Sequence, residues 1–179
     1  MMDRFNSMKN PKKLLILGCG GHGRAVAEVA LDCGYTQVAF LDDNDTNALG
    51  KIEDMDRYVS EYPVSFVGIG NAKLRNELLQ RLERLGYEIA TLIHPTAYVS
   101  RSAVLGKGTV VEPHAIVNTG TSIGCGGILS VGSIVDHDAK IGVCCQIDTG
   151  AIVKSGGFVG DFMKIEAGQV VPGYEAVRV

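Results

Sequence analysis

Tryptophan is absent from this 179-residue chain, and aromatic residues make up only 6% of it. Proteins that bind single-stranded nucleic acid stack the bases on aromatic side chains, so this composition disfavours that class. The formal net charge is −3, and charges of both signs occur in both halves of the chain. Because neither half is strongly basic, we expect neither nucleic acid nor an anionic membrane surface as a partner.

The sequence also lacks a Cys-x-x-Cys pair and any apolar run approaching the about 18 residues of a membrane span. The five cysteines are an odd number, which is typical of reduced thiols in a cytoplasmic protein. Residues 1–10 are polar and contain no apolar signal core. We therefore expect a cytoplasmic protein, in which residues 1–11 are either disordered or added, non-native sequence. The cysteines are Cys19, Cys33, Cys125, Cys144 and Cys145.

An aliphatic residue recurs at every sixth position throughout the C-terminal half. A helix repeats every 3.6 residues and a flat strand every 2, so neither explains a period of six. Hexapeptide repeats are typical of a parallel β-helix, in which short strands alternate with tight turns. The repeated positions are Val99, Leu105, Val111, Val117, Ile123, Leu129, Val135, Ile141, Ile147, Val153, Val159, Ile165 and Val171.

Three hexapeptides would form one triangular coil, so residues 18 apart would stack in three internal ladders. One coil cannot bury its aliphatic face alone, whereas stacked coils form a continuous core. Glycines near the corners would let the chain turn with positive φ. A purely structural scaffold is also consistent with this pattern and stays open as an alternative. The corner glycines are Gly106, Gly108, Gly120, Gly124, Gly126, Gly132, Gly142, Gly150 and Gly156.

The N-terminal half begins with an apolar segment, Lys13–Leu17, that reads as a buried parallel strand. The turn Gly18–Gly23 follows it and matches G-x-G-x-x-G, and Arg24–Cys33 has a helical pattern. A second strand, Val38–Leu41, ends at Asp42. This order of strand, glycine turn, helix, strand and acid is the context that a nucleotide-binding fingerprint requires.

The pattern continues with a third strand at Val64–Ile69 and a helix for which Asn71 is the expected N-cap. A fourth strand is predicted at Glu88–Leu92, and His94 with Pro95 marks the passage into the repeat. The sequence thus predicts an α/β half-Rossmann domain over residues 12–93 and an all-β parallel β-helix over residues 94–179. We assign the apolar stripe of the helix to core packing; its residues are Leu74, Leu78, Leu82 and Leu85.

The glycine turn admits two interpretations. A hydride-transfer enzyme needs a fuller sheet and a catalytic domain, and a β-helix has no obvious place for a nicotinamide. We therefore favour a cradle for a nucleotide sugar or a phosphate, in which glycines let backbone N–H groups approach the phosphate at a helix N-terminus. An NAD-linked oxidoreductase that uses Gly18, Gly20, Gly23 and Asp42 remains an alternative.

Among the four histidines, His137 is distinctive because it lies between Asp136 and Asp138 at a corner of the predicted coil. A neighbouring carboxylate can fix the tautomer and raise the basicity of an imidazole, which makes it a candidate general base. A solvated corner histidine is the equally simple alternative. Only His114 and His137 lie within the repeat, and no third ligand has suitable spacing, so we predict no metal site. We interpret His114 as structural, and Cys145 as a small residue of the repeat.

The chain resembles the family of sugar acetyltransferases that includes the sialic acid O-acetyltransferases and UDP-N-acetylbacillosamine N-acetyltransferase. The resemblance covers nearly the whole chain from Lys12 onward. The segments that carry it are Lys13–Arg24, Leu41–Asp43, Gly68–Asn71, Leu92–Pro95 and Asp136–Asp138.

This resemblance implies a homotrimer of left-handed β-helices, an exception to the usual right-handed crossover. It also implies acetyl-CoA as acyl donor, bound between adjacent helices, and a sugar or nucleotide-sugar acceptor held by the N-terminal domain. Residues 94–179 would then form the acyltransferase domain.

Roles for individual residues also follow from the resemblance. His137 would be the general base for direct transfer to an amine or hydroxyl, and Asp138 would orient it, with Asp136 as second choice. Gly20, Gly21, His22, Asp42 and Asn71 would bind the acceptor, and the helix dipole would favour neutral His22. The donor-binding residues would be Gln146, Ser155 and Gly156.

Two residues depart from the family pattern: Gln146 replaces a frequent histidine, and Ser130 replaces a frequent asparagine. Family members also continue beyond the point where this chain stops, so we expect fewer contacts to the nucleotide end of acetyl-CoA. We therefore predict an acetyl-CoA-dependent N- or O-acetyltransferase. The alternative is a non-catalytic trimeric protein that binds nucleotide sugars or serves as a scaffold.

Overall fold

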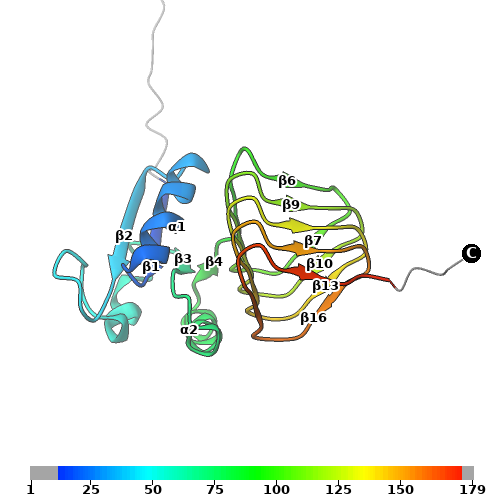
Figure 1. Cartoon of the computed structure of the whole chain (residues 1–179). Helices are drawn as coiled ribbons and strands as arrows, with labels where there is room; N and C mark the ends of the chain where they lie inside the picture. Colours follow the sequence, from blue (N-terminus) through cyan, green and yellow to red (C-terminus); the bar gives the residue numbers. More distant parts are fainter. Residues whose placement is uncertain (1–11, 175–179) are drawn as a thin grey trace, which may run out of the picture.

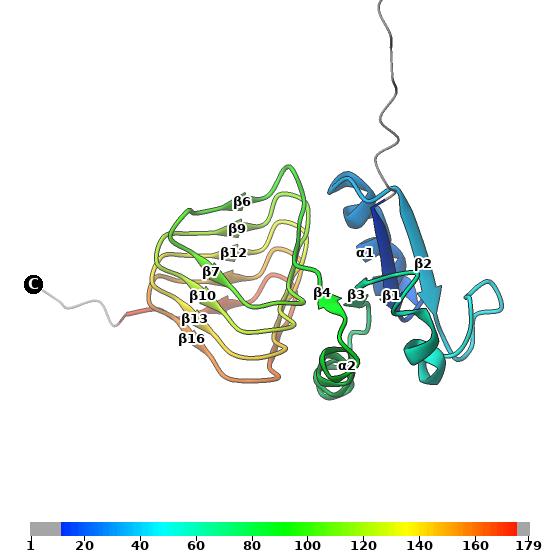
Figure 2. The ribbon, with the colours of Figure 1, turned by 180° about the vertical axis from the view of Figure 1, so that it is seen from behind.

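The computed structural model describes residues 12–174 and contains two units that lie side by side (Figures 1 and 2). The N-terminal unit is a small sheet with helices, and the C-terminal unit is a stack of coils with short strands. Residues 1–11, for which we expected disorder or added sequence, lie outside the described residues. Within residues 12–174, no helix combines the length and the apolar character that crossing a membrane requires.

The N-terminal sheet is parallel, with strand order β2-β1-β3-β4. Its central strand, β1, buries side chains on both faces. Leu14 and Ile16 pack towards α1, while Leu15 and Leu17 pack towards η1 and α2. The elements are β1 (Lys13–Leu17), α1 (Gly21–Asp32), β2 (Gln37–Leu41), η1 (Ile52–Tyr58), β3 (Val64–Val67), α2 (Ala72–Arg84) and β4 (Glu88–Ile89).

The C-terminal unit is the predicted left-handed parallel β-helix, and its strands form three sheets. We call the first the domain face: β5 (Leu92–Ile93), β8 (Val110–Val111), β11 (Ile128–Leu129), β14 (Gln146–Ile147) and β17 (Lys164–Ile165). The apolar face contains β6 (Tyr98–Val99), β9 (Ile116–Val117), β12 (Ile134–Val135), β15 (Ile152–Val153) and β18 (Val170–Val171). The third face contains β7 (Val104–Leu105), β10 (Ser122–Ile123), β13 (Lys140–Ile141) and β16 (Phe158–Val159).

The predicted ladders form the core of this β-helix. Neighbouring strands pair with a register of 18 residues, so Val117 pairs with Val135 and Val135 with Val153. The second residue of each strand points inward, where the central coils are buried and the end coils partly buried. Cys145 is also buried in this core, as its place in the repeat predicts. The hexapeptide spacing thus specifies both the strands and their pairing.

The corner glycines serve two different purposes, of which the sequence predicted one. Glycines such as Gly120 and Gly132 have positive φ, as expected. Gly106, Gly124 and Gly142 do not, so the expectation of positive φ was wrong for them. A Cβ on Gly124 would lie 2.7 Å from the backbone of Gly142 in the next coil. These three glycines are therefore needed for the close approach of successive coils.

The passage between the two units also differs from expectation. The predicted fourth strand, Glu88–Leu92, is divided: β4 pairs with β3, whereas Leu92 in β5 already pairs with Val110 in β8. The outward residues Val110 and Ile128 of the domain face pack in one hydrophobic cluster with β1 and α1. The N-terminal unit is thus seated on the domain face.

The apolar face carries an outward row of large apolar side chains that the N-terminal unit leaves uncovered. Its central members are partly exposed, and Tyr98 and Val170 at its ends are 56% and 52% exposed. Strand pairing places all five residues in one straight row. The row consists of Tyr98, Ile116, Ile134, Ile152 and Val170.

Candidate functional site

A crevice opens at the carboxyl ends of β1, β2 and β3, beside the N-terminus of α1. Ligands of open parallel sheets bind at this edge, where helix N-termini also point. The crevice has a volume of about 380 Å³ and contains four of the five predicted acceptor-binding residues. Its lining is Gly18, Gly20, Gly21, His22, Asp42, Asp43, Asn44, Ile52, Gly68, Ile69, Gly70 and Leu74.

The glycines of the turn divide into packed and open positions. A Cβ on Gly23 would lie 2.0 Å from the carbonyl oxygen of Gly18, so Gly23 allows α1 to approach β1. A Cβ on Gly20 or Gly21 would meet nothing within 4 Å. Gly20 is the N-cap of α1, which begins at Gly21, three residues earlier than predicted. The first turn of α1 therefore presents backbone N–H groups and open space to the crevice.

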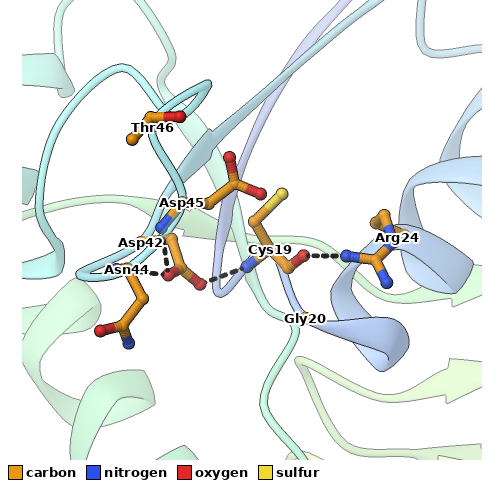
Figure 3. A pocket seen from close by; sticks show the side chains of 7 residues that line it. All are labelled: Cys19, Gly20, Arg24, Asp42, Asn44, Asp45 and Thr46. Atoms are coloured by element: carbon orange, nitrogen blue, oxygen red, sulfur yellow. Dashed lines mark hydrogen bonds between the residues drawn. The ribbon is translucent and has the colours of Figure 1, made fainter.

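The Asp42 carboxylate is largely engaged by the backbone around it (Figure 3). Its Oδ2 accepts the N–H of Cys19 at 2.7 Å, and its Oδ1 accepts the N–H groups of Asn44 and Asp45. These hydrogen bonds, that from Cys19 first, lower the pKa of Asp42. Asp42 thus joins the glycine turn to the loop after β2, and little acceptor capacity remains for the ribose hydroxyls of an NAD site.

At the start of α2, Leu74 lines the crevice, where we had expected Asn71. Asn71 is the N-cap of α2, as predicted, because its Oδ1 accepts the N–H of Leu74 at 3.0 Å. It does not line the crevice, whereas its neighbours Gly70 and Leu74 do. Leu74, which we assigned to the core stripe of α2, is 40% exposed. That assignment was wrong for Leu74, because the first turn of α2 projects beyond the packed part of the stripe.

His22 is partly buried where the N-terminal unit meets the β-helix. Its side chain is 21% exposed, and its Nδ1 lies 3.8 Å from Oε1 of Glu112. Burial, followed by the nearby Arg75 cation, lowers the pKa of His22 to about 4. The neutral imidazole that we expected from the helix dipole is thus favoured mainly by desolvation. Nε2 of His22 is buried and has no hydrogen-bond partner among the described residues.

Glu112 is a site residue that the sequence did not reveal. It lies at the corner between the domain face and the apolar face, 90 residues after His22, and it is buried. Its Oε2 accepts the N–H of Val131 at 3.1 Å. Burial nevertheless raises the pKa of Glu112. Its place after the inward Val111 marked it as a corner residue, but its contact with His22 depends on how the N-terminal unit docks.

His137 lies at a different corner, between the apolar face and the third face. Its side chain is 48% exposed, and its Nδ1 lies 2.9 Å from Oδ2 of Asp138. This hydrogen bond is the main reason why the pKa of His137 is raised. Asp138 adopts φ 58°, a left-handed conformation that aspartate tolerates better than most residues. The Asp138 contact leaves Nε2 of His137 as the ring nitrogen available to accept a proton.

The other acid beside His137 stabilises the corner. Asp136 accepts the hydroxyl of Ser155 at 2.6 Å and the side-chain N–H of Asn118 at 2.9 Å. Its Oδ1 also accepts the backbone N–H of His137. The Ser155 hydroxyl is the largest cause of the lowered pKa of Asp136. Asp136 therefore connects three successive coils, whereas Asp138 contacts the imidazole ring.

The predicted donor-binding residues lie apart in one chain. Ser155 and Gly156 are one coil beyond His137, but the N–H of Gly156 donates to the carbonyl of His137 at 2.8 Å. That N–H is therefore already used, and a Cβ on Gly156 would lie 2.2 Å from the Tyr174 ring. Gln146 begins β14 on the domain face. In a triangular prism this face is opposite the corner that carries His137.

The structure thus contains two separate groups of candidate residues within one chain, the crevice with His22 and the corner with His137. No group of three or more histidine, cysteine or acidic side chains among residues 12–174 is arranged to hold a metal ion.

Comparison with known proteins identifies the chain's relatives. The sequence model of the family described as the PglD N-terminal domain matches residues 13–82. UDP-N-acetylbacillosamine N-acetyltransferase of Bacillus subtilis (strain 168) is 34% identical over 110 residues, which cover 55% of this chain and 50% of that protein. The matched segment thus spans half the length of this curated relative.

Solved structures match over most of the chain. The acetyltransferase domain of PglB from Neisseria gonorrhoeae FA1090, in complex with acetyl coenzyme A, is 30% identical with a TM-score of 0.76. The match covers 91% of this chain and 94% of that domain. A mutant of perosamine N-acetyltransferase from Caulobacter crescentus, in complex with CoA and GDP-perosamine, is 26% identical with a TM-score of 0.79. This match covers 90% of our chain and 89% of the perosamine N-acetyltransferase chain. The chain therefore belongs to the sugar acetyltransferase family that includes UDP-N-acetylbacillosamine N-acetyltransferase.

Proposed function

We propose that this protein is an acetyl-CoA-dependent acetyltransferase that acts on an amino or hydroxyl group of a sugar or nucleotide sugar. The observation that carries the proposal is the hydrogen bond between Nδ1 of His137 and Asp138 at an exposed corner of the β-helix. Relatives with this fold are crystallised with acetyl coenzyme A, and with CoA together with GDP-perosamine. These complexes support a donor thioester and a sugar acceptor as the two substrates here.

We further propose a homotrimer in which the apolar faces of three copies pack together. A row of five large apolar side chains on a flat sheet is unusual for a surface that remains in water. The two edges of this face are the corner with His137 and the corner with Glu112. Around a threefold axis, the His137 corner of one copy would therefore lie beside the Glu112 corner of the next copy. This arrangement would bring together the two groups of residues that one chain keeps apart.

His137 would act as the general base. Its Nε2 accepts the proton from the acceptor amine or hydroxyl as the new C–N or C–O bond forms at the acetyl carbonyl. The C–S bond breaks, and CoA leaves with its sulfur as thiolate, to which the proton is returned. Asp138 holds the ring orientation and stabilises the imidazolium. No acyl-enzyme forms, because the acceptor attacks the thioester directly.

The crevice would hold the acceptor. The open backbone at Gly20 and Gly21, together with the N-terminus of α1, suits a phosphate group of a nucleotide sugar. Neutral His22 would face the sugar, while Asp42 would maintain the shape of the turn. Asn71 would contribute indirectly, because it caps α2 and so fixes the first turn, which carries Leu74.

The donor would lie along the His137 corner. Ser155 is one coil beyond His137, and its neighbourhood would receive the pantetheine arm. Since the N–H of Gly156 already donates to His137 and the Tyr174 ring fills the space beside Gly156, Gly156 would act only through the shape of the backbone and not through a hydrogen bond. Gln146 would come from the domain face of another copy, where its amide could donate to the acetyl carbonyl.

Replacement of His137 tests this function. We expect His137→Asn to keep the fold and acetyl-CoA binding but to lower the transfer rate at least about 100-fold, the lower range for a general base. The matched control is Arg101→Ala, an exposed residue at the same corner two coils earlier. CoA release, followed with a thiol reagent over a panel of UDP-, GDP- and CMP-sugars, measures the rate.

An unchanged rate in His137→Asn would refute the role of His137. If calorimetry shows that the wild-type protein binds nucleotide sugars but not acetyl-CoA, the non-catalytic alternative replaces this proposal. Binding of NAD(H) without binding of acetyl-CoA would instead favour the oxidoreductase.

A further inference from the structure

Arg75, the fourth residue of α2, is a fully buried cation with 1% of its surface exposed. Its guanidinium donates four hydrogen bonds, and all four acceptors are backbone carbonyl oxygens. None of the described carboxylates forms an ion pair with it. A buried charge without a counterion is costly, so its hydrogen bonds must offset a large desolvation penalty.

The four carbonyls belong to both units of the protein. Nη1 of Arg75 donates to Ile69 and Gly70, each at 2.8 Å, in the loop between β3 and α2. Nε donates to Gly126 at 2.8 Å and Nη2 to Cys144 at 2.6 Å. Gly126 and Cys144 occupy equivalent corners of two successive coils of the β-helix. One side chain therefore connects a loop of the crevice to two coils.

The loop held by Arg75 is part of the acceptor crevice. Ile69, Gly70 and Leu74 line it, and Leu74 is one residue before Arg75. The β-helix coils on the other side of Arg75 belong to the unit that carries His137. The distance between the crevice and the corner with His137 thus depends on how the N-terminal unit packs on the β-helix. Arg75 is buried in the contact between these two units.

We propose that Arg75 is a positioning residue for acetyl transfer: it fixes the β3–α2 loop, and with it the bound acceptor sugar, relative to the β-helix. The proposal rests on the function proposed above. An apolar side chain could fill the same volume, but it could not hold four carbonyls from two units at fixed distances. The planar fork of arginine can do so, whereas the ammonium of lysine is a single point of charge.

The influence on His22 supports this role. The Arg75 cation is the second cause, after burial, of the lowered pKa of His22. Arg75 therefore also helps to keep the crevice histidine neutral, so that the residue facing the acceptor presents an uncharged ring.

The test uses the full chain with Arg75→Met and Arg75→Lys, and with Arg84→Met as a matched control. Arg84 is an exposed residue in the last turn of the same helix. Amide hydrogen exchange of residues 68–71 reports the order of the loop without any substrate. Steady-state kinetics with varied acceptor and varied acetyl-CoA, at a temperature where circular dichroism shows every variant folded, report the positioning.

We expect faster exchange of the loop and a decrease of kcat/KM for the acceptor by about 100-fold in Arg75→Met, the typical cost of an error of about 1 Å in placement. The KM for acetyl-CoA should stay unchanged, and Arg75→Lys should not restore the kcat/KM for the acceptor. Wild-type exchange in a folded Arg75→Met, or a kcat/KM for the acceptor equal to that of Arg84→Met, would overturn the proposal. If Arg75→Met fails to fold, the exchange and the acceptor kcat/KM of Arg75→Lys decide in the same way. If the wild-type protein transfers no acetyl group, the proposed function fails, while loop exchange still decides the role of Arg75.

Discussion

A glutamate in the centre of the apolar face would separate the copies of the proposed trimer. Ile134 is the middle residue of the outward row, between Ile116 and Ile152 on the neighbouring strands. In one isolated chain Ile134 is partly exposed, so a glutamate there can reach water and the coil should still form. In the trimer the same carboxylate would be buried against two other copies of itself.

The loss can be estimated for each copy. Burial of the part of Ile134 that is still exposed contributes at most about 1.5–3 kcal/mol, and an unpaired buried carboxylate costs several kcal/mol more. Three copies together therefore lose on the order of 10 kcal/mol, which lowers the association constant by about seven orders of magnitude. Ile134→Glu should thus have the mass of a single 19.0 kDa chain, whereas the wild-type protein should have three times that mass.

Light scattering coupled to size-exclusion chromatography measures the mass, and circular dichroism measures the fold. The matched control is Ser122→Glu, an exposed outward residue of β10 on the third face, which should keep the mass of the wild-type protein. Because the active site would form between copies, Ile134→Glu should also lose acetyl transfer. A wild-type mass for Ile134→Glu, or full activity of a monomeric variant, would refute the reasoning.

Two further variants test the His137 corner and the coil spacing. Asp138→Asn keeps a side chain that tolerates positive φ but removes the carboxylate that raises the pKa of His137. The pKa of His137 in the folded protein should therefore fall, so that its neutral form persists to lower pH. The acidic limb of the kcat/KM profile should then move to lower pH, and a limb that does not move would contradict the assignment. Gly124→Ala should lower the free energy of unfolding by at least about 1–3 kcal/mol, because its Cβ would meet the backbone of the next coil. Gly160→Ala is its control, since among the described residues a Cβ there meets only the Phe158 ring at 4.0 Å, and equal denaturation midpoints for the two variants would exclude the steric explanation.

The β-helix could be predicted from the sequence almost completely, because its contacts follow from a fixed spacing. Val117 and Val135 are 18 residues apart and pair directly. The reason why glycine is required at position 124 could not be predicted from the spacing. Glycine is needed both for positive φ and for close backbone approach, and the sequence does not distinguish the two needs.

The candidate site could be predicted only in part. His137 and Asp138 are adjacent in sequence, so their contact required no knowledge of the tertiary structure. The contacts of His22 with Glu112 and of Arg75 with Cys144 join residues 90 and 69 positions apart. They depend on how the N-terminal unit is seated on the domain face. No local pattern encodes that arrangement, which is why Glu112 and Arg75 were missed.

The corner that carries His137 has a non-glycine residue in the left-handed backbone conformation. Most of the corresponding turn positions are glycines, but position 138 holds an aspartate with φ 58°. Glycine there would ease the backbone and remove the carboxylate in a single change. Stability therefore favours glycine at position 138, whereas catalysis would require aspartate. A screen for stability alone would tend to remove the carboxylate beside the His137 imidazole.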